Sequence, residues 1–209
     1  MAYQHSNVPG VCAGFAALQA LESRLMKEAL RDCRAEWLLE CAPLSSPSPQ
    51  VSLPRHKLLF DAGGVVWPVS AELGAWPLEG NSVPMVLLRH VWQPGLEGDV
   101  LAEALRVLRP GGLLVSVSAN PWHRASWREL GGRSLKLPSW PHFQFIHARQ
   151  EFHLSVPMLQ RLKGLVPGFS PLLLVAGHKP SPPSAIHRRR NARPVLAAGS
   201  APAALCRAA

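Results

Sequence analysis

Polar residues follow two short apolar runs of the chain, and their types suit proton transfer and ligand binding. Arg89 and His90 come directly after the run at residues 85–88, and Asn120 comes soon after the run at residues 113–117. Because an imidazole can take up a proton near neutral pH, His90 is a candidate general base. Asn120 is a second candidate catalytic residue. The alternative for His90 is a hydrogen-bonded histidine at the start of a helix.

These apolar runs are expected to be neighbouring strands joined by a helix. Residues 99–109 have helical spacing, and Asp99 at their start can cap the first free amides. The apolar positions that share one face of this helix are Leu101, Ala104, Leu105 and Leu108. The last turn holds Arg109, and the Pro-Gly-Gly sequence at residues 110–112 ends the helix and turns the chain.

Neither apolar run alternates with polar residues, which is typical of strands that are covered on both faces of a parallel sheet. The crossover between such strands is right-handed. Ligands of these sheets gather beyond the carboxyl ends of the strands. We therefore expect a site around residues 89–91 and 119–121.

The sequence Glu-Ala-Leu-Arg-Val-Leu-Arg-Pro-Gly-Gly at residues 103–112 resembles a known family motif. Class I S-adenosylmethionine-dependent methyltransferases, particularly the type 11 group, carry a similar helix end and turn before their fifth strand. The resemblance implies an α/β, Rossmann-like class I methyltransferase sandwich, mostly parallel, with an antiparallel C-terminal hairpin. It also implies S-adenosyl-L-methionine as cofactor and methyl transfer to an acceptor that is unknown. The alternative is a non-catalytic relative that serves as an interaction protein.

In this family the first strand leads into a glycine-rich cofactor loop that starts with an acidic residue. Glu40 and Cys41 match the beginning of that pattern, and the resemblance makes them cofactor-binding candidates together with Ala42. Ala42, Leu44 and Ser46 stand where the family has its three glycines. A second interpretation of this Pro- and Ser-rich stretch is a loop that covers the edge of the sheet.

The resemblance extends to three further cofactor positions. Asp61 ends a predicted strand at residues 57–60, where the family has an acid that binds the ribose hydroxyls. The alternative for Asp61 is a turn between two short strands. Glu72 and Leu73 open a segment that resembles the family's adenine-binding stretch, although Glu72 could also be a surface acid. Arg89 lies where the fourth strand of the family often contacts cofactor or substrate.

Other parts of the chain have less specific patterns. Residues 15–33 form an expected amphipathic helix, with Glu22 off its apolar stripe. Residues 36–42 are expected to form a strand. The last two strands are expected at residues 143–147 and 171–178, with a short helix at residues 156–163 between them.

Two groups of side chains are of types that bind ligands, nucleic acid for one group and a metal ion for the other. Residues 122–128 combine tryptophan and basic side chains that could stack on bases or pair with phosphates, although a half-buried flap is the simpler interpretation. His142, His147 and His153 have no common zinc spacing, so no metal site is predicted.

The chain carries a formal net charge of +9, with 22 Lys and Arg against 13 Asp and Glu. Six Lys and Arg residues and no acidic residue follow His178, so this part of the chain contributes +6 to the net charge. We therefore divide the chain into a methyltransferase-like domain at residues 1–179 and a basic, disordered tail at residues 180–209. The arginines between Arg188 and Arg193 could bind RNA or another polyanion, or the tail could serve solubility alone.

Four cysteines, Cys12, Cys33, Cys41 and Cys206, show no paired metal-ligand spacing and are expected to be reduced thiols. The chain starts without a basic, apolar leader, and no apolar run reaches the roughly 18 residues of a membrane span. These features favour a cytoplasmic protein that does not enter a membrane.

Overall fold

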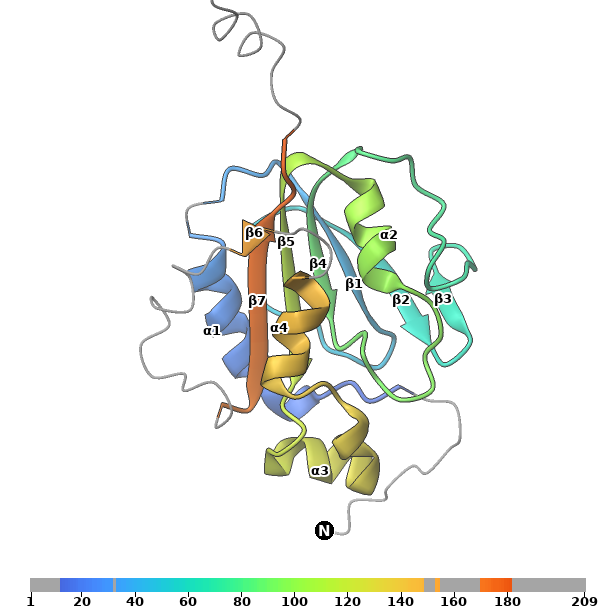
Figure 1. Ribbon diagram of the computed structural model, residues 1–209, viewed down its shortest axis with the longest axis vertical. Helices are drawn as coiled ribbons and strands as arrows, with labels where there is room; N and C mark the ends of the chain where they lie inside the picture. Colours follow the sequence, from blue (N-terminus) through green and yellow to red (C-terminus); the bar gives the residue numbers. More distant parts are fainter. Residues whose placement is uncertain (1–11, 32, 149–152, 155–169, 182–209) are drawn as a thin grey trace, which may run out of the picture.

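The computed structural model describes residues 12–31, 33–148, 153–154 and 170–181. Seven strands form one sheet in the order β3-β2-β1-β4-β5-β7-β6 (Figure 1). The strands are β1 (Leu38–Pro43), β2 (Arg55–Asp61), β3 (Gly64–Trp67), β4 (Val83–Arg89), β5 (Leu108–Ala119), β6 (His153–Leu154) and β7 (Leu172–His178). The α-helices are α1 (Gln19–Ala29), α2 (Val100–Val107), α3 (Arg124–Leu130) and α4 (Trp140–Ala148), and the 3-10 helices are η1 (Ala16–Leu18) and η2 (Gly131–Lys136).

The centre of the sheet is parallel, as the sequence predicts. β4 pairs with β5 in parallel, with Met85 opposite Leu113 and Leu88 opposite Ser116. β1 is parallel to both β4 and β2. α2 connects β4 to β5, and Asp99 caps it by accepting a hydrogen bond from the amide of Ala102. The predicted strand–helix–strand unit is confirmed, except that the helix ends at Val107 and Arg109 already belongs to β5.

The outermost strands on both sides of the sheet pair in an antiparallel manner. β3 returns along β2 through a tight turn, and β7 runs antiparallel to β5 and to β6. The predicted α/β fold, mostly parallel with an antiparallel C-terminal hairpin, is thus confirmed.

Helices cover the two faces of the sheet because its side chains alternate between them. On one face, α2 packs on Leu39, Val86 and Leu114, while α4 places Phe143 against Leu173 and Val175. On the other face, α1 packs on a set formed by Leu38, Met85, Leu87, Val115 and Leu174. Figure 1 shows α2 and α4 in front of the sheet and α1 behind it.

Two sequence-based expectations are wrong. Residues 143–147 lie in helix α4 rather than in a strand, with Phe143 and His147 buried one helical turn apart. Glu22 lies on the buried face of α1 and is only 1% exposed. The predicted helix at residues 156–163 lies outside the described residues, as does nearly all of the basic tail.

Candidate functional site

The carboxyl ends of β1, β2, β4 and β5 lie at one edge of the sheet, where the sequence predicts the site. His90 follows β4 there, and its amide donates to the carbonyl of Val117 at 2.8 Å. Asn120 follows β5 at the same edge. The residues between the strands and the N-terminal part of the chain decide what this edge can bind.

Arg89, at the end of β4, is the centre of a buried ionic cluster. Its Nε and Nη2 atoms donate to the two carboxylate oxygens of Glu22 on α1, at 2.6 and 2.7 Å. Its Nη1 donates to Glu40 Oε1 on β1 at 2.7 Å. Each of these three residues is at most 1% exposed. The cluster therefore fixes α1 to the sheet directly below the predicted site.

This cluster also reaches the loop after β1. Arg89 Nη2 donates to Ser46 Oγ and to the carbonyl of Pro47, at 3.0 and 2.9 Å. Glu40 Oε2 has no hydrogen bond to the described part of the chain, but Arg55 Nη1 lies 3.6 Å from it and balances its charge. Two carboxylates thus face two guanidinium groups. The partly exposed Arg55 and the buried Arg89 together compensate the two buried acids.

His90 is held in an unusual state. Its backbone is left-handed, with φ at 52°, and its side chain is almost fully buried. Neither ring nitrogen makes a hydrogen bond to a described residue, and Glu22 Oε1 lies 3.9 Å from Nε2. Burial lowers the pKa of His90 to about 4; Arg89 adds to this effect and Glu22 opposes it. His90 is therefore neutral at physiological pH.

The N-terminal segment, residues 12–15, crosses this edge of the sheet (Figure 1). The amide of Cys12 donates to Asp61 Oδ1 at 3.0 Å, and its carbonyl accepts from Ser45 Oγ at 2.7 Å. The side-chain amide of Gln93 binds both backbone groups of Ala13, accepting from its N–H at 2.7 Å and donating to its carbonyl at 2.8 Å. Side chains after β1, at the end of β2 and after β4 therefore hold this segment through its backbone.

Close packing adds to these hydrogen bonds. A Cβ atom at Gly14 would lie 2.4 Å from the carbonyl oxygen of Ser45, so only glycine fits there. Phe15 has a left-handed backbone, with φ at 51°, and is 1% exposed. Its ring lies on that of His90 with 4.4 Å between the centroids. The segment therefore covers His90.

The remaining predicted cofactor residues lie near this edge but do not form one cluster. Asp61 also accepts from the amide of Ala62 at 2.9 Å, which makes it part of the turn between β2 and β3. Cys41 and Ala42 are fully buried in β1, and burial raises the pKa of the Cys41 thiol. Glu72 is exposed, whereas Leu73 is buried.

Glu103 and Arg106 of the family-like motif hold the segment that contains Glu72. Glu103 Oε1 accepts from the amide of Trp76 at 2.6 Å and from Arg106 Nη2 at 2.7 Å. Arg106 Nη2 also donates to the carbonyl of Leu78 at 2.7 Å. The two charged residues of the motif thus dock residues 76–78 on α2, which is a positioning role.

Asn120 organises the end of β5. Its Nδ2 donates to the carbonyl of Ser170 at 2.8 Å, and its Oδ1 accepts from the amide of Trp122 at 3.0 Å. Its own carbonyl accepts from Ser126 Oγ at 2.6 Å. These bonds tie the start of α3 and the residues before β7 to the strand end.

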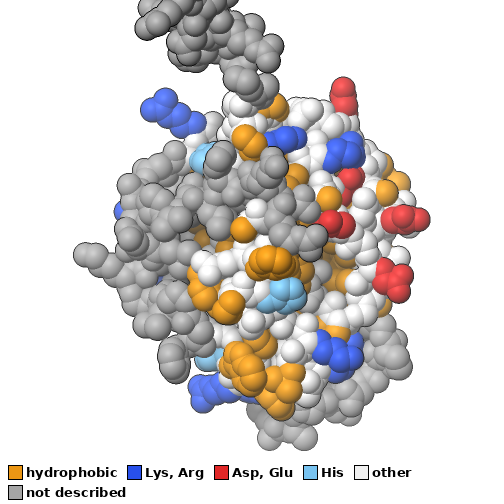
Figure 2. All heavy atoms as spheres, viewed as in Figure 1, with side chains coloured by type: hydrophobic (Ala, Val, Ile, Leu, Met, Phe, Trp, Pro, Cys, Tyr) orange, Lys and Arg blue, Asp and Glu red, His pale blue; other side chains and the backbone are white. Residues whose placement is uncertain are grey.

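Exposed aromatic side chains surround this region on α3 and α4. Hydrophobic side chains gather over these helices in Figure 2. The exposed aromatic side chains of this region are Trp122, just before α3, Trp127 on α3 and Phe145 on α4. A stacking role for the stretch from Trp122 to Arg128 stays a prediction.

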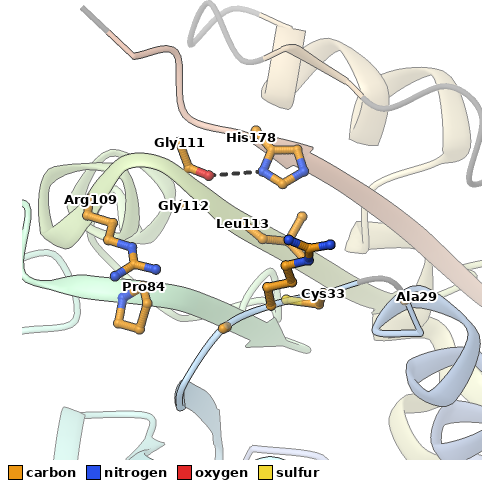
Figure 3. A pocket seen from close by; sticks show the side chains of 10 residues that line it. Ala29, Cys33, Pro84, Arg109, Gly111, Gly112, Leu113 and His178 are labelled. Carbon is orange, nitrogen blue, oxygen red and sulfur yellow. Dashed lines mark hydrogen bonds between the residues drawn. The ribbon is translucent and has the colours of Figure 1, made fainter.

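A concavity of about 330 Å³ lies at the opposite end of the sheet (Figure 3). It is lined by the amino ends of β4 and β5, with Pro84, Arg109 and Leu113, and by His178 at the end of β7. His178 Nδ1 lies 3.1 Å from the carbonyl of Gly111. Because parallel sheets bind ligands beyond the carboxyl ends of their strands, this hollow is separate from the predicted site.

Sequence reasoning missed Gln93, Glu22 and the N-terminal segment. Glu22 lies four residues after Leu18 and four before Met26, which are both buried, so its spacing alone could have placed it on the inner face of α1. No local pattern indicates that Gln93 contacts Ala13, because 80 residues separate them.

Among the described residues, no group of three His, Cys, Asp or Glu side chains is arranged to hold a metal ion. None of the described helices is both long enough and apolar enough to cross a membrane.

No protein-family model matches the sequence, and no curated protein matches it. Solved structures do show similarity. They include an S-adenosylmethionine-dependent methyltransferase from Aquifex aeolicus, with 17% identity, a TM-score of 0.37, and coverage of 52% of this chain and 51% of that chain. This chain therefore spans about half the length of the Aquifex protein.

Two further structures cover more of the chain. An S-adenosylmethionine-dependent methyltransferase from Thermotoga maritima has 14% identity and a TM-score of 0.45, over 77% of this chain and 90% of that one. A methyltransferase candidate from Haloferax volcanii, in complex with the methyltransferase activator Trm112, has 13% identity and a TM-score of 0.43. The similarity covers 81% of this chain and 99% of that one. Similarity this remote carries no argument about reaction or substrate.

Proposed function

We propose that the protein is an S-adenosylmethionine-dependent methyltransferase of the class I, type 11-like kind, acting on an acceptor that the sequence does not identify. The proposal rests on the motif at residues 103–112 and on the sheet. The observation that carries it is the parallel arrangement of β2, β1, β4 and β5, which brings Asp61 and His90 to the same end of the strands. This is the edge where α/β sheets bind their ligands.

The described conformation does not accommodate the cofactor at this edge. Phe15 covers His90, and Asp61 binds the backbone of Cys12 rather than a ligand. Ala42 and Ser46 carry side chains where the family has glycine. We therefore assign no catalytic step to His90 or Asn120, and their catalytic roles stay predictions.

The same observations favour a second candidate, a non-catalytic protein that retains the fold as an interaction platform. Its sheet would be sealed permanently by residues 12–15, and the basic tail would bind a polyanion or a partner protein. Cofactor binding distinguishes these two candidates directly.

The test is thermal unfolding of the full chain with S-adenosylmethionine and with S-adenosylhomocysteine. A ligand at about 100 times its dissociation constant stabilises a protein by about 2.7 kcal/mol. A raised midpoint at millimolar ligand supports the methyltransferase, and an unchanged midpoint supports the platform.

The variant Glu72→Ala tests the predicted adenine contact. It should reduce the shift, because an exposed acid near the adenine amino group is lost. Glu79→Ala is the matched control, since Glu79 is an exposed acid on the same connection between β3 and β4. Equal shifts in the two variants would remove Glu72 from the site.

A further inference from the structure

The N-terminal segment is bound as a ligand would be bound. Three polar side chains from three different connections contact its backbone: Ser45 after β1, Asp61 at the end of β2 and Gln93 after β4. Gln93 makes a two-point contact with the peptide groups of Ala13. Such convergence of polar groups on one short stretch is what a binding crevice provides.

The fit of this segment depends on a single missing side chain. Gly14 lies so close to the carbonyl of Ser45 that a Cβ would come within 2.4 Å of the oxygen and 2.7 Å of its carbon. Both of these atoms belong to the backbone, which cannot move away as a flexible side chain can. An alanine at position 14 is therefore incompatible with the bound position of the segment.

The bound position is also strained. Phe15 and His90 are both in the left-handed region, which favours glycine, and they pack against each other. Both ring nitrogens of His90 are buried without hydrogen bonds to described residues, while the ring of Phe15 lies on the imidazole. Release of the segment would free Phe15 from its left-handed conformation and hydrate the imidazole of His90. The closed state is therefore opposed by local costs that a competing ligand could exploit.

We infer that residues 12–15 are an intramolecular inhibitor that occupies the cofactor crevice and must leave before S-adenosylmethionine binds. This inference rests on the proposed function. It predicts that ligand binding and the bound segment are mutually exclusive. Asp61 and Gln93 would then exchange the backbone of Cys12 and Ala13 for the ligand.

The experiment compares the full-length wild type with Gly14→Ala and with Gly132→Ala. Gly132 is the matched control, because a Cβ there meets no atom within 4 Å and its backbone is not left-handed. Calorimetry gives the dissociation constant of S-adenosylhomocysteine, and hydrogen–deuterium exchange follows the amides of Cys12 and Ala13. Phe15→Ala serves as a second releasing variant if Gly14→Ala does not fold.

We expect Gly14→Ala to bind S-adenosylhomocysteine at least about tenfold more tightly than wild type, because the open state no longer has to be populated at a cost. Gly132→Ala should bind as wild type does. In the wild type, the ligand should accelerate exchange at both amides. Ligand binding with both amides still protected would overturn the inference and leave the proposed function intact.

Failure of the proposed function has a different signature. If exchange shows that the segment is released in Gly14→Ala, and neither S-adenosylmethionine nor S-adenosylhomocysteine binds this variant at millimolar concentration, the crevice is not a cofactor site. The inhibitor inference then falls with it. If the wild type binds S-adenosylhomocysteine and Gly14→Ala releases the segment without binding this ligand more tightly, only the inhibitor role is overturned.

Discussion

The rings of Phe15 and His90 lie 4.4 Å apart, at 34° to each other, and both residues have left-handed backbones. Each such residue costs roughly 1–2 kcal/mol relative to a right-handed one. The pair sits where the N-terminal segment meets the end of β4. This contact connects the state of the predicted base to the position of residues 12–15.

Acid should destabilise the protein through His90. Its pKa is lowered from 6.5 in the unfolded chain to about 4 in the fold, so between these values the unfolded state binds a proton that the folded state does not. The contribution of His90 to the free energy of unfolding is fully present above pH 6.5. It is lost as the pH decreases towards 4, by about 3 kcal/mol in total. Urea unfolding from pH 7.5 to 4 measures this loss.

His90→Asn isolates the contribution of this side chain, because asparagine tolerates a left-handed backbone and does not titrate in this range. His147, whose pKa is also lowered by burial, is present in both proteins and cancels in the comparison. The stability of the variant should depend less on pH than that of the wild type. Parallel curves for the two proteins would show that His90 is not buried in its neutral form.

Cys12 should report the position of the N-terminal segment. Burial raises the pKa of its thiol to about 11, and the neighbouring Asp61 adds to the shift. At a pH below both the ordinary pKa and this raised pKa, the fraction of the thiol present as the reactive thiolate is about a hundredfold smaller. Alkylation of Cys12, followed by peptide mass spectrometry, should be slow in the wild type and faster in Gly14→Ala. The same rate in both proteins would mean that the alanine leaves the segment in place.

The central unit of the fold was predictable because its signals are local. Asp99 caps α2, and Pro110 and Gly111 follow shortly after its last turn. The two flanking runs are apolar except for Ser116, as is typical of strands covered on both faces. The identity of α4 was not predictable in this way. Phe143 and Phe145 alternate as in a strand, whereas the decisive spacing is that of Phe143 and His147, which a short window cannot distinguish.

The binding partners of the site residues were harder to predict than the elements. Arg89 was expected to contact a ligand, and the structure places Glu22 and Glu40 against it, 67 and 49 residues away in the chain. The apolar stripe at residues 15–33 predicts that Leu18 and Met26 are buried, but an apolar pattern does not predict that the acid between them is buried as well. Long-range polar pairs leave no periodic trace, so they become visible only when the fold is known.

Gly112, inside β5, should be essential to the close approach of this strand to β4. A Cβ there would lie 2.8 Å from the carbonyl of Arg109 and 2.9 Å from that of Pro84, both of which are backbone atoms. We expect Gly112→Ala to lower the free energy of unfolding by more than about 1 kcal/mol. Gly132→Ala should change it little or raise it slightly, because its Cβ enters open space. Equal urea midpoints for the two variants would contradict the close approach at Gly112.

Arg89→Met should be among the most damaging substitutions in the protein. It leaves the carboxylates of Glu22 and Glu40 buried without the guanidinium that binds both. Breaking a buried ion pair in this way costs about 3–5 kcal/mol, whereas loss of an exposed pair costs about 1 kcal/mol or less. Urea unfolding at neutral pH measures the difference.

The combined variant Glu22→Gln, Glu40→Gln, Arg89→Met identifies the cause of that loss. If the damage comes from unpaired buried charge, neutralising both acids should recover part of the stability, although the hydrogen bonds to Ser46 and Pro47 stay lost. If the damage came only from the missing packing of the arginine stem, the combined variant would be no more stable than Arg89→Met. Recovery would therefore show that the unpaired charges of Glu22 and Glu40, rather than the lost packing, cause the damage.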